Sequence, residues 1–157
     1  GSMAEPIQNS IINLRCHHHT KKVKNMPKPT NEDAVLIVQI FGIGAADAEY
    51  QKAVMWFFAE MNEKNYDDYK KKYPMGSEGS QNFMKISSYM ELVGTLVNRE
   101  VLSEDLVFEM WGDMEWEKAK PIIYGMRKDL AMPRFLENYE ILARKFPEWA
   151  EKNPIKI

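Results

Sequence analysis

One stretch, residues 81–112, limits most strongly what this chain can fold into. Its apolar side chains recur at intervals of three and four residues, the spacing of one helix face, at Phe83, Ile86, Met90, Val93 and Val97. A second helix start follows, with Ser103 as N-cap and acids in the first turn. Gly94 suggests that another helix crosses nearby. The stretch therefore predicts two consecutive helices joined by a tight reversal.

Helical patterns continue on both sides of this pair. Apolar residues line up at helical spacing before residue 81 and after residue 112, and short polar segments separate them. Two prolines fall within the downstream patterns, and each removes a backbone donor from a helix. We therefore predict an all-α fold, a single-domain bundle of six to seven helices with kinks near Pro121 and Pro147.

The longest apolar segment, residues 34–46, admits two interpretations. A capping box at Thr30 begins a helix that Gly42 and Gly44 are expected to end near Phe41. The same glycines match the Gly-x-Gly-x-x-Ala pattern of dinucleotide-binding folds. That fold needs a parallel sheet, and no second buried strand is evident in the sequence. We favour a buried helix, because the segment is also too short to cross a bilayer.

Length and composition indicate one soluble domain. A chain of 157 residues, 45% hydrophobic and 28% charged, can bury a core without disulfides. Residues 1–3 resemble a cloning scar, residues 4–29 a basic N-terminal arm, residues 30–152 the helical domain and residues 153–157 a C-terminal tail. No secretory signal is visible, and a single cysteine indicates a reducing compartment, so we expect the cytoplasm.

Charge is distributed unevenly along the chain. Residues 1–30 hold five Lys or Arg and one acid, whereas residues 31–157 hold 16 Lys or Arg and 22 acids. The basic arm can therefore be tethered to the acidic body or to an acidic partner. A loosely held, solvated chain end is the other interpretation.

The only cysteine and the only histidines of the chain are adjacent, at Cys16, His17, His18 and His19. Neighbouring side chains point about 100° apart on a helix, so these four cannot converge on one metal. A zinc site would need carboxylates or a second subunit. The body lacks both residue types and thus the usual general base and thiol nucleophile. We predict no catalytic residue, no metal and no cofactor.

Two further patterns could indicate a binding site: pairs of acids, which suit a metal ion, and a lysine run with tyrosines, which suits a nucleic acid. Glu109 and Asp113, like Glu100 and Glu104, are four residues apart and can share a helix face to hold Mg²⁺. Lys70–Lys72, interleaved with tyrosines, resembles a nucleic-acid patch. Solubilising surface acids and lysines paired with acids one turn away are the simpler interpretations in an acidic body. We therefore expect no nucleic-acid partner.

Arg127 is the most informative charged residue. Apolar positions bracket it on its helix, so its stem should be partly buried and its guanidinium should need an acidic partner. We interpret the site as a structural ion pair, with an anion-binding pocket as the alternative. The candidate cluster consists of Arg127, Glu91, Glu109, Trp116 and Tyr124.

Methionine and aromatic residues are abundant. The chain has 11 methionines and 18 aromatic residues, more than a small bundle needs for its core. Some of the methionines are expected at an exposed surface that suits a protein partner. The candidates for that surface are Met55, Met75, Met84, Met110, Met114, Met126 and Met132.

The order of core and capping residues from Glu32 to about Lys152 resembles a family of small bacterial all-helical domains of unknown function. The matching residues are Asp47-Ala-Glu-Tyr, Asn82-Phe83, Glu91-Leu-Val-Gly, Val101 to Val107, Trp116, Pro121 and Arg127. The resemblance implies an all-α fold and supplies no activity. Some relatives carry a membrane helix before the domain; this chain has a basic polar arm there, so no membrane role is expected.

The leading hypothesis from sequence is a non-enzymatic cytoplasmic interaction or scaffolding module. It would self-associate, as a homodimer, through an apolar helix face, and the basic arm can embrace the partner. One alternative is a helical module that binds an apolar or anionic small molecule near Arg127. The other, less favoured, is a carboxylate-metal enzyme.

Overall fold

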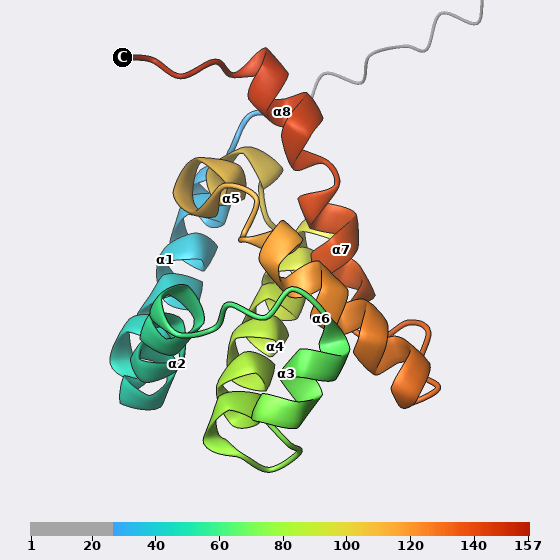
Figure 1. The fold of residues 1–157 in the computed structure, drawn as a ribbon. Helices are drawn as coiled ribbons and strands as arrows, with labels where there is room; N and C mark the ends of the chain where they lie inside the picture. Colours follow the sequence, from blue (N-terminus) through green and yellow to red (C-terminus); the bar gives the residue numbers. More distant parts are fainter. Residues whose placement is uncertain (1–26) are drawn as a thin grey trace, which may run out of the picture.

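The computed structural model describes residues 27–157, which form eight α-helices and no β-strand (Figure 1). The helices are α1 (Asn31–Ala46), α2 (Ala48–Ala59), α3 (Tyr66–Lys72), α4 (Glu78–Asn98), α5 (Glu104–Trp111), α6 (Trp116–Asp129), α7 (Glu137–Ala143) and α8 (Phe146–Lys152). The predicted all-α, single-domain bundle is confirmed. The cloning scar, the arm before residue 27 and the Cys16–His19 cluster lie outside the described residues.

Helix α4 is the central element of the bundle. It packs against α2 on one side and α7 on the other, and its stripe of Phe83, Ile86, Val93 and Val97 is buried as predicted (Figure 1). The helix begins three residues before the predicted start, because the Ser77 hydroxyl accepts a hydrogen bond from the backbone N–H of Ser80. The remaining helices are arranged around this stripe.

Gly94 allows α4 and α7 to cross closely. A methyl group at this position would lie 2.4 Å from the backbone carbonyl oxygen of Asn138 and 3.0 Å from the backbone nitrogen of Tyr139. Both contacts are with backbone atoms, which cannot rotate away as a side chain can. The helix crossing that Gly94 suggested is confirmed, and only glycine fits it.

The prediction that glycines end α1 is wrong. Gly42 and Gly44 lie inside the helix, which continues to Ala46. Gly44 is needed for packing, because a methyl group there would lie 2.9 Å from the ring of Tyr50. The dinucleotide-binding alternative also lacks support, since residues 27–157 contain no strand to precede the glycines.

One carboxylate connects the starts of α1 and α5. Asp33 completes the predicted capping box of α1, and its Oδ2 accepts a 2.7 Å hydrogen bond from the backbone N–H of Thr30. Its Oδ1 accepts a second bond, 2.8 Å long, from the backbone N–H of Ser103. Ser103 is the N-cap of α5, as predicted, but its own hydroxyl caps nothing. Asp33 therefore positions the turn that leads into α5.

The two helix prolines behave differently. Pro121 lies within α6, which continues across it without a break. Pro147 lies in the first turn of α8, where a missing backbone N–H costs no helical hydrogen bond. The predicted last helix is divided just before it, at Arg144 and Lys145, into α7 and α8. This division brings the number of helical segments to eight.

None of the helices in residues 27–157 combines the length and the apolar content needed to cross a bilayer.

Candidate functional site

The acidic partner of Arg127 is Glu140, on the neighbouring helix α7. Arg127 Nη1 lies 2.5 Å from Glu140 Oε2, and the two side chains are 16% and 11% exposed. Arg127 Nε also donates a 2.7 Å hydrogen bond to the backbone carbonyl of Phe135, just before α7. The guanidinium therefore joins α6 both to the start of α7 and to its inward face.

Two more side chains complete the surroundings of Glu140. The Tyr124 hydroxyl donates a 2.6 Å hydrogen bond to Glu140 Oε1, and the guanidinium of Arg144, just beyond the end of α7, pairs with the same oxygen. Arg144 also donates to the Tyr124 hydroxyl. We call Arg127, Tyr124, Glu140 and Arg144 the Glu140 cluster. Its two guanidiniums and one carboxylate give it one net positive charge.

The protonation of Glu140 is set by opposing effects. Burial raises the pKa of its carboxyl group, but the hydrogen bonds from Tyr124 and Arg127 and the charges of Arg127 and Arg144 outweigh burial. The pKa of Glu140 consequently lies below its usual value of 4.5. The carboxylate is ionised at neutral pH and balances one of the two guanidiniums.

The predicted aromatic neighbours do lie at this cluster. Trp116 contacts Tyr124 edge to face, with ring centroids 6.1 Å apart, and contacts Tyr139 in the same way at 5.1 Å. Trp116 and Tyr139 are buried, and the Arg127 guanidinium carbon lies 5.4 Å from the centroid of the Tyr124 ring. These rings exclude water from one side of the cluster.

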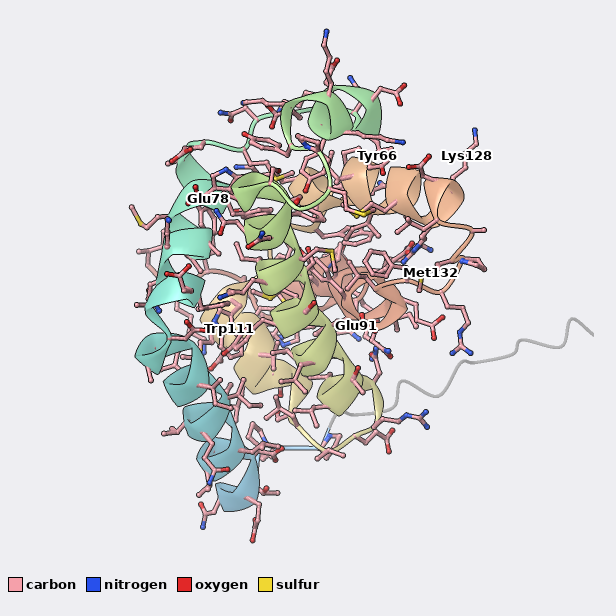
Figure 2. The ribbon with its side chains drawn as sticks, turned by 90° about the horizontal axis from the view of Figure 1, so that it is seen from below. Tyr66, Glu78, Glu91, Trp111, Lys128 and Met132 are labelled. Atoms are coloured by element: carbon pink, nitrogen blue, oxygen red, sulfur yellow. The ribbon has the colours of Figure 1, made fainter. Side chains whose placement is uncertain are left out.

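The two acids predicted as partners of Arg127 lie elsewhere. Glu91 projects from α4 toward α7 (Figure 2), where it accepts hydrogen bonds from the backbone N–H of Tyr139 at 2.9 Å and from the Asn138 side chain at 2.8 Å. It therefore caps the first turn of α7, whose own N-cap residue, Leu136, offers no side-chain oxygen. Glu109 is exposed on α5.

The sequence did not identify Glu140 as the partner of Arg127. Which side of α7 faces Arg127 depends on where the loop before it ends and the helix begins, at Glu137. A weak signal was present, since Glu140 follows Tyr139 directly and precedes Leu142 and Ala143, all of which are buried. An acid beside such a stripe needs a buried partner. The sequence did not indicate that α6 would supply that partner.

One feature of the Glu140 cluster resembles a ligand site, and another argues against it. Arg127 Nη2 is buried and has no hydrogen-bond partner among the described residues. However, two cavities of the described part of the chain, of about 480 and 710 Å³, are lined by other residues. The contacts present at the cluster join helices α6 and α7, which is a structural role.

The acid pairs and the lysine run, which could have indicated a metal site and a nucleic-acid site, make other contacts in the structure. Within residues 27–157, no group of three His, Cys, Asp or Glu side chains is placed to hold a metal ion. Lys70 pairs with Asp129 and Lys72 with Glu63, each at 2.6 Å, rather than with acids one helical turn away. These lysines thus tie α3 to the end of α6 and to the loop before α3.

The outer face of α1 is the most apolar exposed helix surface. Val35, Val38, Phe41 and Ile43 are 59%, 68%, 50% and 63% exposed, while only Ile37, Ile40 and Gly44 of this helix are buried. The prediction of a buried helix over residues 34–46 therefore holds for its inner side alone. We call these four exposed side chains the α1 outer face; helix α1 itself lies at the edge of the bundle (Figure 1).

The exposed methionines come from four separate parts of the chain. Met55 on α2, Met75 before α4, Met110 on α5 and Met132 after α6 are all exposed, whereas Met114 and Met126 are buried in the core. Met132 lies beyond the end of α6, at the opposite edge of the molecule from α1 (Figure 2). The α1 outer face is denser in apolar side chains than any of these four regions.

A family model described as a domain of unknown function (DUF4760) matches residues 29–146. No curated protein and no solved structure gives a significant match to the chain.

Proposed function

We propose that this chain, which belongs to the family described as a domain of unknown function (DUF4760), is an interaction module that self-associates through the α1 outer face. The observation that supports the proposal is the exposure of Val35, Val38, Phe41 and Ile43 on one helix. A helix that is apolar on all sides is normally buried on all sides. A second copy of α1 would supply the missing cover.

The composition of α1 favours a second copy over other partners. Residues 34–46 contain no charged side chain, so the face offers nothing for a charged peptide to recognise. Helices that lie on membrane surfaces usually carry Lys or Arg on their polar side. The only charged residues of α1 are Glu32 and Asp33, which anionic headgroups would repel. An uncharged, apolar surface instead suits an identical surface.

The geometry of α1 allows a symmetric pairing. Val38 is the most exposed of the four side chains and lies at the middle of the helix, Asn31–Ala46. An antiparallel copy related by a two-fold axis near Val38 would place Val35 of one chain beside the region of Phe41 of the other. Gly42 has no side chain, and a β-carbon placed there would have no neighbour within 4 Å, which leaves room for a helix to approach.

The size of the face predicts a weak dimer. A 16-residue helix is about 24 Å long and about 10 Å wide. The area of one face of such a helix is smaller than the roughly 800 Å² that each partner buries in a standard interface. Met55 and Phe58 on α2 are exposed as well and can extend the contact. We expect association that depends on protein concentration.

The test is Val38→Glu with a matched control. Each copy would then carry a carboxylate at the centre of the interface, so light scattering should give a monomer at concentrations where the unmodified chain is dimeric. Ile141→Glu replaces another exposed β-branched helix residue, on α7, and should leave the dimer intact. Equal dimerisation of Val38→Glu and the unmodified chain would refute the proposal. Co-sedimentation of a monomeric chain with phosphatidylcholine vesicles would assign the face to a membrane and also refute it.

A further inference from the structure

The larger cavity, of about 710 Å³, lies where the start of α1, the turn between α4 and α5, and α8 meet. Its apolar side is formed by Val97, Leu102 and Trp149. The Trp149 indole N–H donates a 2.7 Å hydrogen bond to Asp105, which fixes the ring against α5. The elements that line the cavity lie at the end of the molecule where the described chain begins (Figure 1).

The lining of this cavity is acidic. Three lysines contribute, at Lys28, Lys145 and Lys152; Lys145 pairs with Glu104 at 2.9 Å and Lys152 with Glu148 at 2.6 Å. Six acids outnumber them and give the lining three net negative charges. They are Glu32, Asp33, Glu100, Glu104, Asp105 and Glu148. An apolar floor with an acidic rim suits a short basic segment that carries one apolar side chain.

Such a segment directly precedes the cavity in the chain. Pro27 and Lys28 are part of the lining, and the residues just before them read Lys21-Lys22-Val23-Lys24. At most about 3.6 Å per residue separates these lysines from Pro27, so they cannot lie far from the rim. A tether this short gives the segment an effective concentration in the millimolar range. Even modest attraction would then hold it in place.

We propose that residues 21–24 of the same chain bind over this cavity, with the lysines on the acidic rim and Val23 against the apolar floor. The arm is thereby fixed to the domain at the junction of α1, α5 and α8. This interaction does not use the α1 outer face, because none of the four side chains of that face lines the cavity. The proposal accounts for the opposite charges of the arm and the body.

The experiment uses the full chain, with a nitroxide attached to Cys16, its only cysteine. The indole N–H signals of the tryptophans are recorded by ¹⁵N-correlated NMR, with the reduced label as diamagnetic reference. Trp149 lines the cavity, whereas Trp56 and Trp116 do not and serve as controls in the same spectrum. We expect selective loss of the Trp149 signal, and its recovery at high salt because screening weakens the attraction.

Charge reversal separates binding from mere proximity of the tether. The labelled triple variant Lys21→Glu, Lys22→Glu, Lys24→Glu should regain most of the Trp149 intensity while its melting temperature stays close to that of the unmodified chain. Unchanged loss of the Trp149 signal in this variant, or equal loss at Trp56 and Trp149, would overturn the proposal. A signal loss that appears only between mixed labelled and unlabelled chains would do so as well, because the arm would then bind another copy.

Discussion

Arg127 on α6 and Glu140 on α7 form a largely buried ion pair, with Nη1 and Oε2 2.5 Å apart. The pair is not symmetric in its surroundings. Glu140 retains Arg144 and Tyr124 if Arg127 is removed, whereas Glu140 is the only carboxylate that pairs with Arg127 among residues 27–157. Loss of the acid therefore leaves a buried charge unpaired, and loss of Arg127 does not.

We accordingly expect Glu140→Gln to destabilise the fold more than Arg127→Met. The costs should be about 3 kcal/mol for the first and about 1–2 kcal/mol for the second, as is typical when one partner of a buried pair is lost. Urea unfolding of both variants and of the double variant measures these costs and their coupling. Strictly additive costs, or a larger cost for Arg127→Met, would contradict the arrangement.

Glu140 should also make stability depend on pH in the acid range. The pKa of Glu140 is lowered in the folded state, so its contribution to stability is fully present above the unfolded value of 4.5. That contribution is lost as the pH falls through the lower, folded pKa. The difference in unfolding free energy between the unmodified chain and Glu140→Gln should therefore be constant near pH 7 and shrink below about pH 4. A difference that stays constant to pH 2.5 would show that Glu140 titrates normally.

Two glycine substitutions test helix packing as a matched pair. Gly94→Ala should cost about 2–3 kcal/mol, because its methyl group would collide with the backbone of Asn138 and force α4 and α7 apart. Gly42→Ala, in the interior of α1 with nothing within 4 Å, should instead stabilise by about 0.5–1 kcal/mol. Thermal melts of both variants suffice. A melting temperature of Gly94→Ala equal to or above that of the unmodified chain would contradict the close packing of α4 on α7.

Glu91 and Glu109 offer a second matched pair. Glu91→Gln weakens the hydrogen bonds to the backbone of Tyr139 and to Asn138, so we expect a cost of about 1–2 kcal/mol and faster amide exchange in the first turn of α7. Glu109→Gln changes an exposed acid and should stay within about 0.5 kcal/mol of the unmodified chain. Hydrogen exchange at Tyr139 is the decisive observation, and equal protection in both variants would rule out the cap.

Local signals in the sequence predicted the helices well. The stripe of α4 and the helix starts at Thr30 and Ser103 depend on residues close in sequence. Such features are fixed by short-range geometry, which the spacing of residues encodes directly. These parts of the fold could therefore be predicted from the sequence alone.

The candidate site could be predicted only in part. The apolar spacing around Arg127 correctly predicts its partial burial, and Trp116 and Tyr124 do lie beside it. Its partner could not be chosen, because Glu91 and Glu140 become neighbours of α7 and α6 only through long-range packing. Residues 34–46 raise the same difficulty, since an apolar helix pattern does not tell whether the same chain or another chain covers it.

The most direct measurement of the central proposal is the mass of the unmodified chain in solution as its concentration is raised. Sedimentation equilibrium should show a weight-average mass that increases from 18.3 kDa toward about twice that value, and Val38→Glu should remove the increase. A mass that stays at 18.3 kDa up to the highest soluble concentration would contradict self-association through α1.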